Sequence, residues 1–521
     1  MRNAMKIFQR PLGASMLAVA AVMSVGGCSS DDNGNGGSVD ASTNPAGDAA
    51  PDSAGDSAAN SMSDSSMNPA GETSTSDAGE AGPGDAGAAK EVVYANSGVT
   101  LNTFDLAADG TLSPKASMSL GQTLQFAYFD SKSQHLYAGV GATSDPLFSL
   151  HAFSIDAASG LLTEIPASAD GGGVVSPNGR IINLTLSRDD KYLLTIHNVT
   201  KAYTVFQLNA DGTIGARVQQ ADGGDTGIGA YLHQVRVDPS NKYATICDRG
   251  NDPVYASDGG VMTPEDIGHL RVFTYASGLL TPVDTSTITF PTGIGPRHLD
   301  FHPSQPWVYL SAERGNRLIT YTFSNGVLTE KFNTTSVAVA GDMGMLNATE
   351  AINGQRAGAI MVHPSGKFLW ITNRNWALEP YTPDAGAAVG SSEAGSADAS
   401  SEAGAASDAA ALAPVQVFTG NGENNVALFK IDQMTGEPTF VAATDSHGFE
   451  PRTFALDPSG RFLIVGNQKR VNTLTSAGVV AVLPNLSVFQ VGADGTLTFL
   501  KTYDQSGGEV LWEGVATATG M

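Results

Sequence analysis

Residues 454–468 read FALDPSGRFLIVGNQ: an apolar run, a turn built from Asp, Pro, Ser and Gly, and a second apolar run. This order is typical of a buried β-hairpin, because the turn residues adopt the backbone angles that the two strands cannot. The same 15-residue pattern occurs in six copies along the chain. The other five begin at Phe126, Leu184, Val235, Leu299 and Ile360.

A second unit alternates with this hairpin. It has an aromatic residue followed by a short turn that contains glycine, as in VFQVGADGTL around Phe489. Seven such aromatic residues occur, namely Phe104, Phe153, Phe206, Phe273, Tyr321, Phe429 and Phe489. A period of roughly 40 to 50 residues with two hairpins per repeat favours a β-propeller whose blades are four-stranded antiparallel sheets.

The two ends of the repeat region supply the missing inner hairpin. EVVYANS from Glu91 and EVLWEGVAT from Glu509 both read as strands, and together they complete a seventh blade. Joining the first and last strands in one blade closes the ring and leaves no open sheet edge there. We therefore predict an all-β, seven-bladed propeller over residues 90–521. A β-solenoid or a two-sheet sandwich does not account for the complementary ends.

The first 27 residues read as an export signal. Arg2, Lys6 and Arg10 precede an apolar stretch, Leu12–Val25, that is too short to span a bilayer. Val25-Gly26-Gly27-Cys28 resembles the bacterial lipobox, which implies cleavage before Cys28 and acylation of that cysteine. We expect an exported protein of the cell envelope, held at a membrane only by its lipid. An ordinary signal peptide with a chance cysteine is the alternative.

Two segments have the composition of linkers. Residues 28–89 contain hardly any large apolar residue and no Lys or Arg, so we expect a disordered tether. A similar Ala, Ser, Gly, Asp and Glu run lies within a loop insertion at about 377–424. Much of the net charge of −24 belongs to these segments. The acidity therefore does not mark a binding face, and we expect a monomer with no nucleic-acid partner.

The antiparallel order of the inner hairpin brings two positions per repeat to the top of the central channel. The first position, two residues before each 15-residue unit, reads Leu124, Ile182, His233, Arg297, Gly358 and Arg452. The second position, the last residue of each unit, reads Val140, Asn198, Arg249, Glu313, Arg374 and Gln468. Several cations, one carboxylate and a histidine at one mouth favour an anion-binding site.

Other reactive residue types read as structural. His302 and His363 each precede a proline in a turn between strands, so we expect turn residues rather than ligands. Cys247 lies in an apolar strand and reads as a small buried side chain. The sequence has no HExxH motif and no cysteine pair, so we predict neither a metal nor a cofactor.

The repeat region resembles the lactonase family of seven-bladed propellers, which includes 6-phosphogluconolactonase and the carboxymuconate cyclases. The resemblance rests on GIGPRHLDFHP from Gly293 followed by Glu313, on LHQVRVDP from Leu232, and on EPRTFALDPSGRFLIVGNQ from Glu450. It implies a catalytic set of His233, Arg297, Glu313 and Arg374. His298 and Arg452 lie nearby, and with Arg249 and Gln468 they form the expected substrate-binding set.

The chain departs from the family pattern in two places. Gly358-Ala359-Ile360-Met361 replaces an acidic residue and a histidine, and His197-Asn198 stands where an aromatic residue is usual. These departures bear on substrate contacts and on whether activity is retained.

The resemblance implies hydrolysis of a small anionic lactone. Glu313 or His233 is then the general base, Arg297 stabilises the oxyanion, and Arg374 with Arg452 holds a phosphate or carboxylate. Since 6-phosphogluconolactone is a cytosolic metabolite and export is expected here, the sequence leaves open a different lactone as the substrate or no lactone at all. A non-catalytic binding propeller on a lipid tether and a muconate-type cyclase or isomerase are the alternatives.

Overall fold

The structure is a computed structural model that describes eleven segments of the chain. They are residues 90–141, 148–166, 180–198, 200–221, 229–255, 261–337, 354–375, 377–382, 414–418, 422–476 and 478–518. The expected signal peptide, the expected acylation site Cys28, the expected tether and most of the insertion at 377–424 lie outside these residues. None of the described segments forms a helix long and apolar enough to cross a bilayer.

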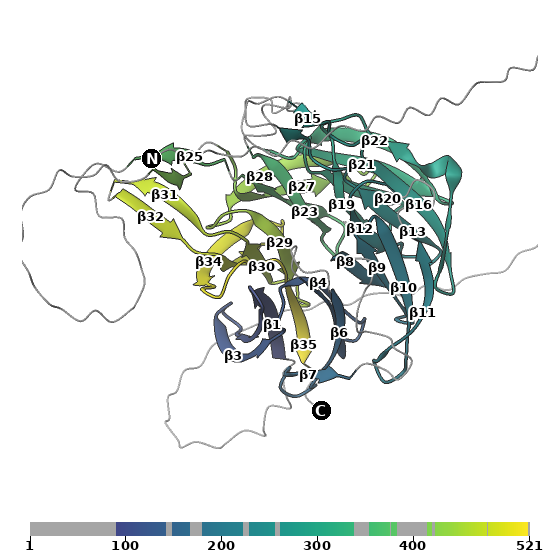
Figure 1. Cartoon of the computed structure of the whole chain (residues 1–521), viewed down its shortest axis with the longest axis horizontal. Helices are drawn as coiled ribbons and strands as arrows, with labels where there is room; N and C mark the ends of the chain where they lie inside the picture. Colours follow the sequence, from purple (N-terminus) through teal and green to yellow (C-terminus); the bar gives the residue numbers. More distant parts are fainter. Residues whose placement is uncertain are drawn as a thin grey trace, which may run out of the picture. The chain divides into compact units, whose positions relative to one another are not determined.

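Seven antiparallel sheets are arranged around a common centre (Figure 1), where the cavities of the central channel lie. Blade 1 contains β35 (Glu513–Ala518), β1 (Lys90–Ser97), β2 (Thr100–Leu106) and β3 (Leu112–Ser119), from the channel outward. Blade 2 contains β4 (Leu124–Phe129), β5 (His135–Val140), β6 (Ser149–Ile155) and β7 (Leu162–Ile165). Blade 3 contains β8 (Ile181–Leu186), β9 (Tyr192–His197), β10 (Ala202–Leu208) and β11 (Ile214–Ala221).

The remaining blades repeat this order. Blade 4 contains β12 (Leu232–Val237), β13 (Tyr243–Asp248), β16 (His269–Ala276) and β17 (Leu279–Pro282), followed by the 3₁₀ turn η1 (Asp284–Ser286) and the short β18 (Ile288–Thr289). Blade 5 contains β19 (Pro296–Phe301), β20 (Trp307–Ala312), β21 (Arg317–Ser324) and β22 (Val327–Thr335). Blade 6 contains β23 (Arg356–Val362), β24 (Phe368–Arg374), β27 (Asn425–Ile431) and β28 (Pro438–Asp445). Blade 7 contains β29 (Pro451–Leu456), β30 (Phe462–Asn467), β33 (Asn485–Val491) and β34 (Leu497–Asp504).

The ring closes as the ends of the repeat region predict. β1 pairs antiparallel with β35, with Val93 opposite Val515, so the first and last strands share blade 1 (Figure 1). The fully buried Asn96 holds this junction. Its Oδ1 accepts the N–H groups of Leu511 and Trp512, both at 2.9 Å, and its Nδ2 donates to the Glu509 carbonyl at 3.1 Å.

The core lies between neighbouring blades rather than at one centre. One apolar cluster joins Trp307 and Tyr309 of blade 5 to Leu369 and Phe429 of blade 6. Burial decreases outward, since all residues of β20 are buried while β34 is mostly exposed. Each pair of apolar faces is therefore covered only when the next blade is in place.

The glycines of the outer turns connect adjacent blades. Tyr309 Oη donates to the Gly436 carbonyl at 2.9 Å, and Trp370 Nε1 donates to the Gly495 carbonyl at 3.0 Å. Both glycines have positive φ angles, and a Cβ at either would lie within 2.6 Å of the ring of an aromatic residue. The glycine of the second sequence unit is thus required both by the turn and by the neighbouring blade.

Three short hairpins extend from the connections between the second and third strands of a blade, on the face that we call the upper face. They are β14 (Val254–Tyr255) with β15 (Val261–Thr263), β25 (Glu379–Tyr381) with β26 (Val415–Val417), and β31 (Val471–Thr475) with β32 (Gly478–Val482). The second and third hairpins touch, because Phe418 N–H donates to the Asn472 carbonyl at 2.8 Å. The β25–β26 hairpin lies within the range 377–424 that the sequence analysis assigns to an insertion.

Candidate active site

A β-bulge near the upper end of the innermost strand positions the candidate site residues. In blade 4 the register passes from Leu232 opposite Asp248 to Gln234 opposite Cys247, so His233 is the extra residue. Arg297 and Arg452 are the extra residues of β19 and β29 in the same way. A bulge turns one side chain away from the regular alternation of the strand. In this protein the bulge directs the side chain of the extra residue toward the channel.

The bulge also corrects one sequence assignment. In blade 2 the extra residue is Gln125, one position later than the Leu124 that the spacing predicts. Leu124 is fully buried in an apolar cluster with Trp512. In blade 6 the irregularity spans Gly358 and Ala359, and a Cβ on Gly358 would lie 2.1 Å from Thr372 Oγ1. That position therefore has no room for the side chain that the other blades carry.

These bulges and the ends of the second strands enclose a cavity of about 530 Å³, which we call the upper pocket. Six of the eight predicted side chains line it, namely His233, Arg249, Glu313, Arg374, Arg452 and Gln468. Arg297 and His298 do not line it. The upper pocket also contains Thr123, Gln125, Arg180, Ile182, Tyr231, Lys469, Glu509 and Leu511.

Glu313 is the centre of an arginine cluster and is only 2% exposed. Its Oε1 lies 2.7 Å from Arg249 Nη1 and 3.6 Å from Arg356 Nη1. Its Oε2 lies 2.9 Å from Arg297 Nε and 3.1 Å from Arg374 Nη2. Burial alone would raise the pKa of Glu313, but the charges of Arg249 and Arg374 outweigh it and hold the pKa well below the usual range. Glu313 is therefore ionised at neutral pH and is a weak proton acceptor.

His233 has the opposite character. It is buried, and burial together with the charge of Arg297 lowers its pKa well below the usual histidine range. Among the described residues its Nδ1 has no hydrogen-bond partner. Its ring lies 5.0 Å from the ring of His298, measured between centroids. His233 is therefore a neutral imidazole in the wall of the upper pocket, and this unprotonated form is the one that can accept a proton.

Arg297 and His298 lie beneath the upper pocket. Arg297 is 1% exposed, and its Nη1 lies 3.1 Å from His298 Nδ1, which accepts the hydrogen bond. Burial and the charge of Arg297 lower the pKa of His298 well below its usual value, so His298 is neutral. The sequence thus identified two residues that support the upper pocket from below rather than line it.

The upper pocket carries an excess of positive charge. Five cationic side chains and two carboxylates line it: Arg180, Arg249, Arg374, Arg452 and Lys469 against Glu313 and Glu509. Burial and the neighbouring Arg374 lower the pKa of Arg452 to about 10, which still leaves it charged at neutral pH. No described carboxylate forms an ion pair with Arg452. The arrangement favours an anionic ligand.

Sequence reasoning missed Arg356, which reaches the cluster from the start of β23. Its Nη1 lies 3.0 Å from Asp252 Oδ1, so it links Glu313 to a second carboxylate. Arg314, also missed, is buried beneath Arg249 and donates to its carbonyl at 2.6 Å. The signal for Arg356 was weak, because it lies two residues before the irregular glycine of blade 6. The charge that blade 6 lacks at Gly358 is supplied from this earlier position.

The residues that the sequence analysis interprets as structural lie in turns or are buried. His302 Nε2 donates to the Gly366 carbonyl at 2.9 Å, and its Nδ1 accepts from Gln305 N–H at 3.0 Å, which fixes a turn between strands. His363 contacts Ser365 in the equivalent turn. Cys247 is buried, and burial raises the pKa of its thiol. The described residues contain no group of three or more His, Cys, Asp or Glu arranged to hold a metal ion.

Comparison with known proteins places these residues in context. Residues 91–477 match the family model described as a seven-bladed β-propeller lactonase. The 6-phosphogluconolactonase of Bacillus subtilis is 24% identical over 297 residues, which cover 56% of this chain and 64% of that protein. The 6-phosphogluconolactonase of Pectobacterium carotovorum is 27% identical over 294 residues, covering 56% of this chain and 76% of that one. The matched part is thus just under two thirds of the Bacillus protein.

Solved structures with the same fold include a periplasmic gluconolactonase of Pseudomonas aeruginosa. It has a TM-score of 0.57 at 20% identity, with 82% of this chain and 99% of that chain covered. A putative 6-phosphogluconolactonase of Bacteroides fragilis has a TM-score of 0.55 at 18% identity, with 84% and 99% covered. At these identities the likeness shows the propeller fold.

We predict that Glu313→Gln destabilises the protein by about 3–5 kcal/mol at pH 7, because it leaves buried arginines without their shared carboxylate. The folded-state pKa of Glu313 lies below the unfolded value of 4.5, so its contribution exists above that pH and disappears as the pH falls through the folded-state pKa. Urea unfolding should show that the difference in unfolding free energy between the variant and the wild type is smaller at pH 4 than at pH 7. The exposed Glu330→Gln is the control, and equal stability of both variants would contradict the prediction.

Proposed function

The chain belongs to the family of seven-bladed β-propeller lactonases, and on that premise we propose that it hydrolyses the ring ester of an anionic sugar-acid lactone. One observation carries the proposal: a neutral, buried histidine and an excess of cationic side chains line the same upper pocket. The fold by itself does not select a reaction, because propellers serve many functions. The names of the relatives support a lactone as the substrate.

His233 is the general base in this proposal. It removes a proton from a water molecule as the water oxygen attacks the carbonyl carbon of the lactone. The tetrahedral intermediate collapses with cleavage of the ring C–O bond, and the protonated His233 returns the proton to the leaving alkoxide. One water is consumed and one hydroxy acid is formed. Glu313, the other base considered from the sequence, is disfavoured because both of its oxygens are held in ion pairs with arginines.

Arginines supply the two remaining functions, stabilisation of the oxyanion and binding of the anionic group of the substrate. Arg249 lies beside His233 in blade 4, since its guanidinium stacks 4.5 Å above the Tyr231 ring, which contacts His233. We assign oxyanion stabilisation to Arg249 rather than to Arg297, because Arg297 is buried between Glu313 and His298. Arg374 and Arg452 hold the phosphate or carboxylate of the substrate. Gln468 donates to Glu509 at 3.0 Å and completes the wall beside them.

We expect the purified protein to hydrolyse members of a panel of phosphorylated and carboxylated sugar lactones, and His233→Gln to lower kcat by about 10²–10⁴-fold. Because burial lowers the pKa of His233, the base form persists in acid, and activity should stay constant from pH 7.5 to below pH 6. The exposed Arg217→Gln serves as the control for handling and folding. An unchanged kcat in His233→Gln would exclude this base. No turnover of any lactone by folded wild-type protein would favour a binding propeller instead.

The proposed contact between Arg452 and the anionic group of the substrate predicts a selective loss of affinity for anionic lactones when Arg452 is replaced. Arg452→Met should raise KM for an anionic lactone by about 10–100-fold, since charge-assisted hydrogen bonds are lost, and should change KM for an uncharged lactone little. Steady-state kinetics on a matched pair of lactones, with and without the anionic group, measures this difference. Equal effects on both substrates would show that Arg452 does not contact the anion.

We further propose that the protein is exported and anchored through acylated Cys28, as the lipobox-like Val25–Cys28 suggests. The lactone substrate would then lie in the cell envelope. Cells supplied with labelled fatty acid should incorporate label into the wild type and not into Cys28→Ser. Labelling of both proteins would contradict the anchor, and labelling of neither would favour an ordinary signal peptide.

A further inference from the structure

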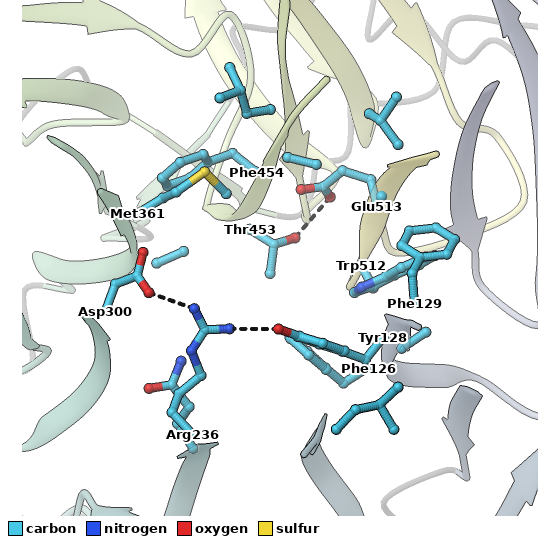
Figure 2. Close-up of a pocket in the computed structure, with 18 of the residues that line it drawn as sticks. Phe126, Tyr128, Phe129, Arg236, Asp300, Met361, Thr453, Phe454, Trp512 and Glu513 are labelled. Carbon is cyan, nitrogen blue, oxygen red and sulfur yellow. Dashed lines mark hydrogen bonds and ion pairs between the residues drawn. The ribbon is translucent and has the colours of Figure 1, made fainter. Parts of the chain in front are cut away.

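The channel contains a second cavity below the arginine cluster. We call it the lower cavity; it measures about 460 Å³ and extends to the turns between the first and second strands, including Asp130 and Ser131 of blade 2. His298 contributes to it, whereas His233 and the arginines around Glu313 do not. Its walls are largely aromatic and apolar. They include Phe126, Tyr128, Phe129, Met361, Phe454 and Trp512 (Figure 2).

One carboxyl group in the lower cavity has an incomplete set of partners. Glu513 is 4% exposed, and Thr453 Oγ1 donates to its Oε2 at 2.8 Å. Among the described residues, its Oε1 has no hydrogen-bond partner. No lysine or arginine forms an ion pair with it in the described part of the chain, in contrast to Glu313. Burial raises the pKa of Glu513 to about 8, and the bond from Thr453 opposes this only in part.

The opposite wall of the lower cavity is charged, but Arg236 and Asp300 there neutralise each other in an ion pair. Arg236 Nη2 lies 2.5 Å from Asp300 Oδ1, and Arg236 Nη1 donates to Tyr128 Oη at 3.2 Å (Figure 2). Two cationic side chains, Arg188 and Arg236, line the lower cavity together with four acidic ones, Asp130, Asp190, Asp300 and Glu513. When Glu513 is ionised, the acidic groups exceed the cations by two. The charge balance is therefore the reverse of that in the upper pocket.

We propose that the lower cavity binds a small organic cation, an amine or quaternary ammonium with an apolar body, whose charge lies against Glu513 and the surrounding aromatic rings. Tyr, Trp and Phe faces attract cations, and a carboxylate without its own counter-ion gains one when such a ligand binds. The size of the cavity lies in the range of small-molecule sites. The proposal is independent of the lactonase activity, because it uses no residue of the upper pocket.

Binding of a cation is coupled to loss of the Glu513 proton. Thr453 and the backbone of Gly466 face this carboxyl from blade 7, and across the cavity stand Arg236, Asp300, Tyr128 and His298, with Asp130, Asp190 and Arg188 at the rim. The pKa of His298 lies well below its usual value, so His298 stays neutral as Glu513 titrates. Since the cation binds the ionised form, affinity rises with pH, and each bound cation releases up to one proton.

The test uses the full-length protein and two probes, benzyltrimethylammonium, which is charged at every pH, and the uncharged 2-phenylethanol. Calorimetry should show benzyltrimethylammonium binding that strengthens about 20-fold between pH 6.5 and pH 8.5, as expected for a site whose carboxyl has a pKa of about 8. Titrations in two buffers of different ionisation enthalpy should detect the released proton. This wild-type measurement does not depend on any variant.

Glu513→Gln should weaken binding at pH 8.5 by at least about tenfold and abolish its pH dependence. Gln matches the protonated carboxyl in shape, so thermal unfolding should show a folded protein. Glu509→Gln removes a carboxylate from the upper pocket and should leave the cation affinity unchanged. Three results would each overturn the proposal: cation binding that is independent of pH or of Glu513, tighter binding of 2-phenylethanol that weakens above pH 8, and no binding of either probe at millimolar concentration.

Discussion

The pairing of β1 with β35 is the constraint on which the channel depends. It joins residues separated by more than 400 positions and is fixed by Asn96, whose side chain bonds the backbone of Leu511, Trp512 and Glu509. The final strand and the residues before it contribute directly to both cavities. Glu509 and Leu511 line the upper pocket, and Trp512 and Glu513 line the lower cavity. An open ring would expose two sheet edges and would also leave each cavity without one wall. Closure therefore builds the sites as well as stabilising the fold.

The arginine cluster around Glu313 shows how a propeller can maintain a cationic pocket. Four guanidinium groups approach one carboxylate, from the second strands of blades 4 and 6 and the innermost strands of blades 5 and 6. One carboxylate cannot neutralise four cations, although Asp252 balances part of the charge from Arg249 and Arg356. Holding like charges together in a buried place is unfavourable, and an anionic ligand relieves part of that repulsion. Burial, and next the charge of Arg374, lower the pKa of Arg452 at the edge of this cluster. The repulsion among these arginines thus both destabilises the buried cluster and favours the binding of an anion.

The repeats were sufficient to predict the propeller, the closing blade and six of the eight side chains expected at the mouth of the channel, which line the upper pocket. The ends of the second strands were assigned most accurately, because Arg249, Glu313, Arg374 and Gln468 all line it. The starts of the innermost strands were harder, since spacing does not reveal a β-bulge, and Gln125 rather than Leu124 occupies the repeated position. Arg356 was missed because it precedes an irregular part of β23. The lower cavity was missed because Phe126, Phe454 and Trp512 have the composition of a core, and because Glu513 belongs to the repeat that is split between the chain ends.

The β-bulge explains how one short strand can serve two cavities of opposite charge. In a regular strand, successive side chains point to opposite faces, so only alternate residues of the innermost strand would reach the channel. The bulge breaks this alternation at its extra residue. As a result His233 lines the upper pocket while the next residue, Gln234, lines the lower cavity, and Arg452 and Thr453 are divided in the same way. Arg297 and His298 form the layer between the two cavities, joined by their own hydrogen bond. A single extra residue in the innermost strands of blades 2, 3, 4, 5 and 7 thus separates a cationic end of the channel from an acidic and aromatic one.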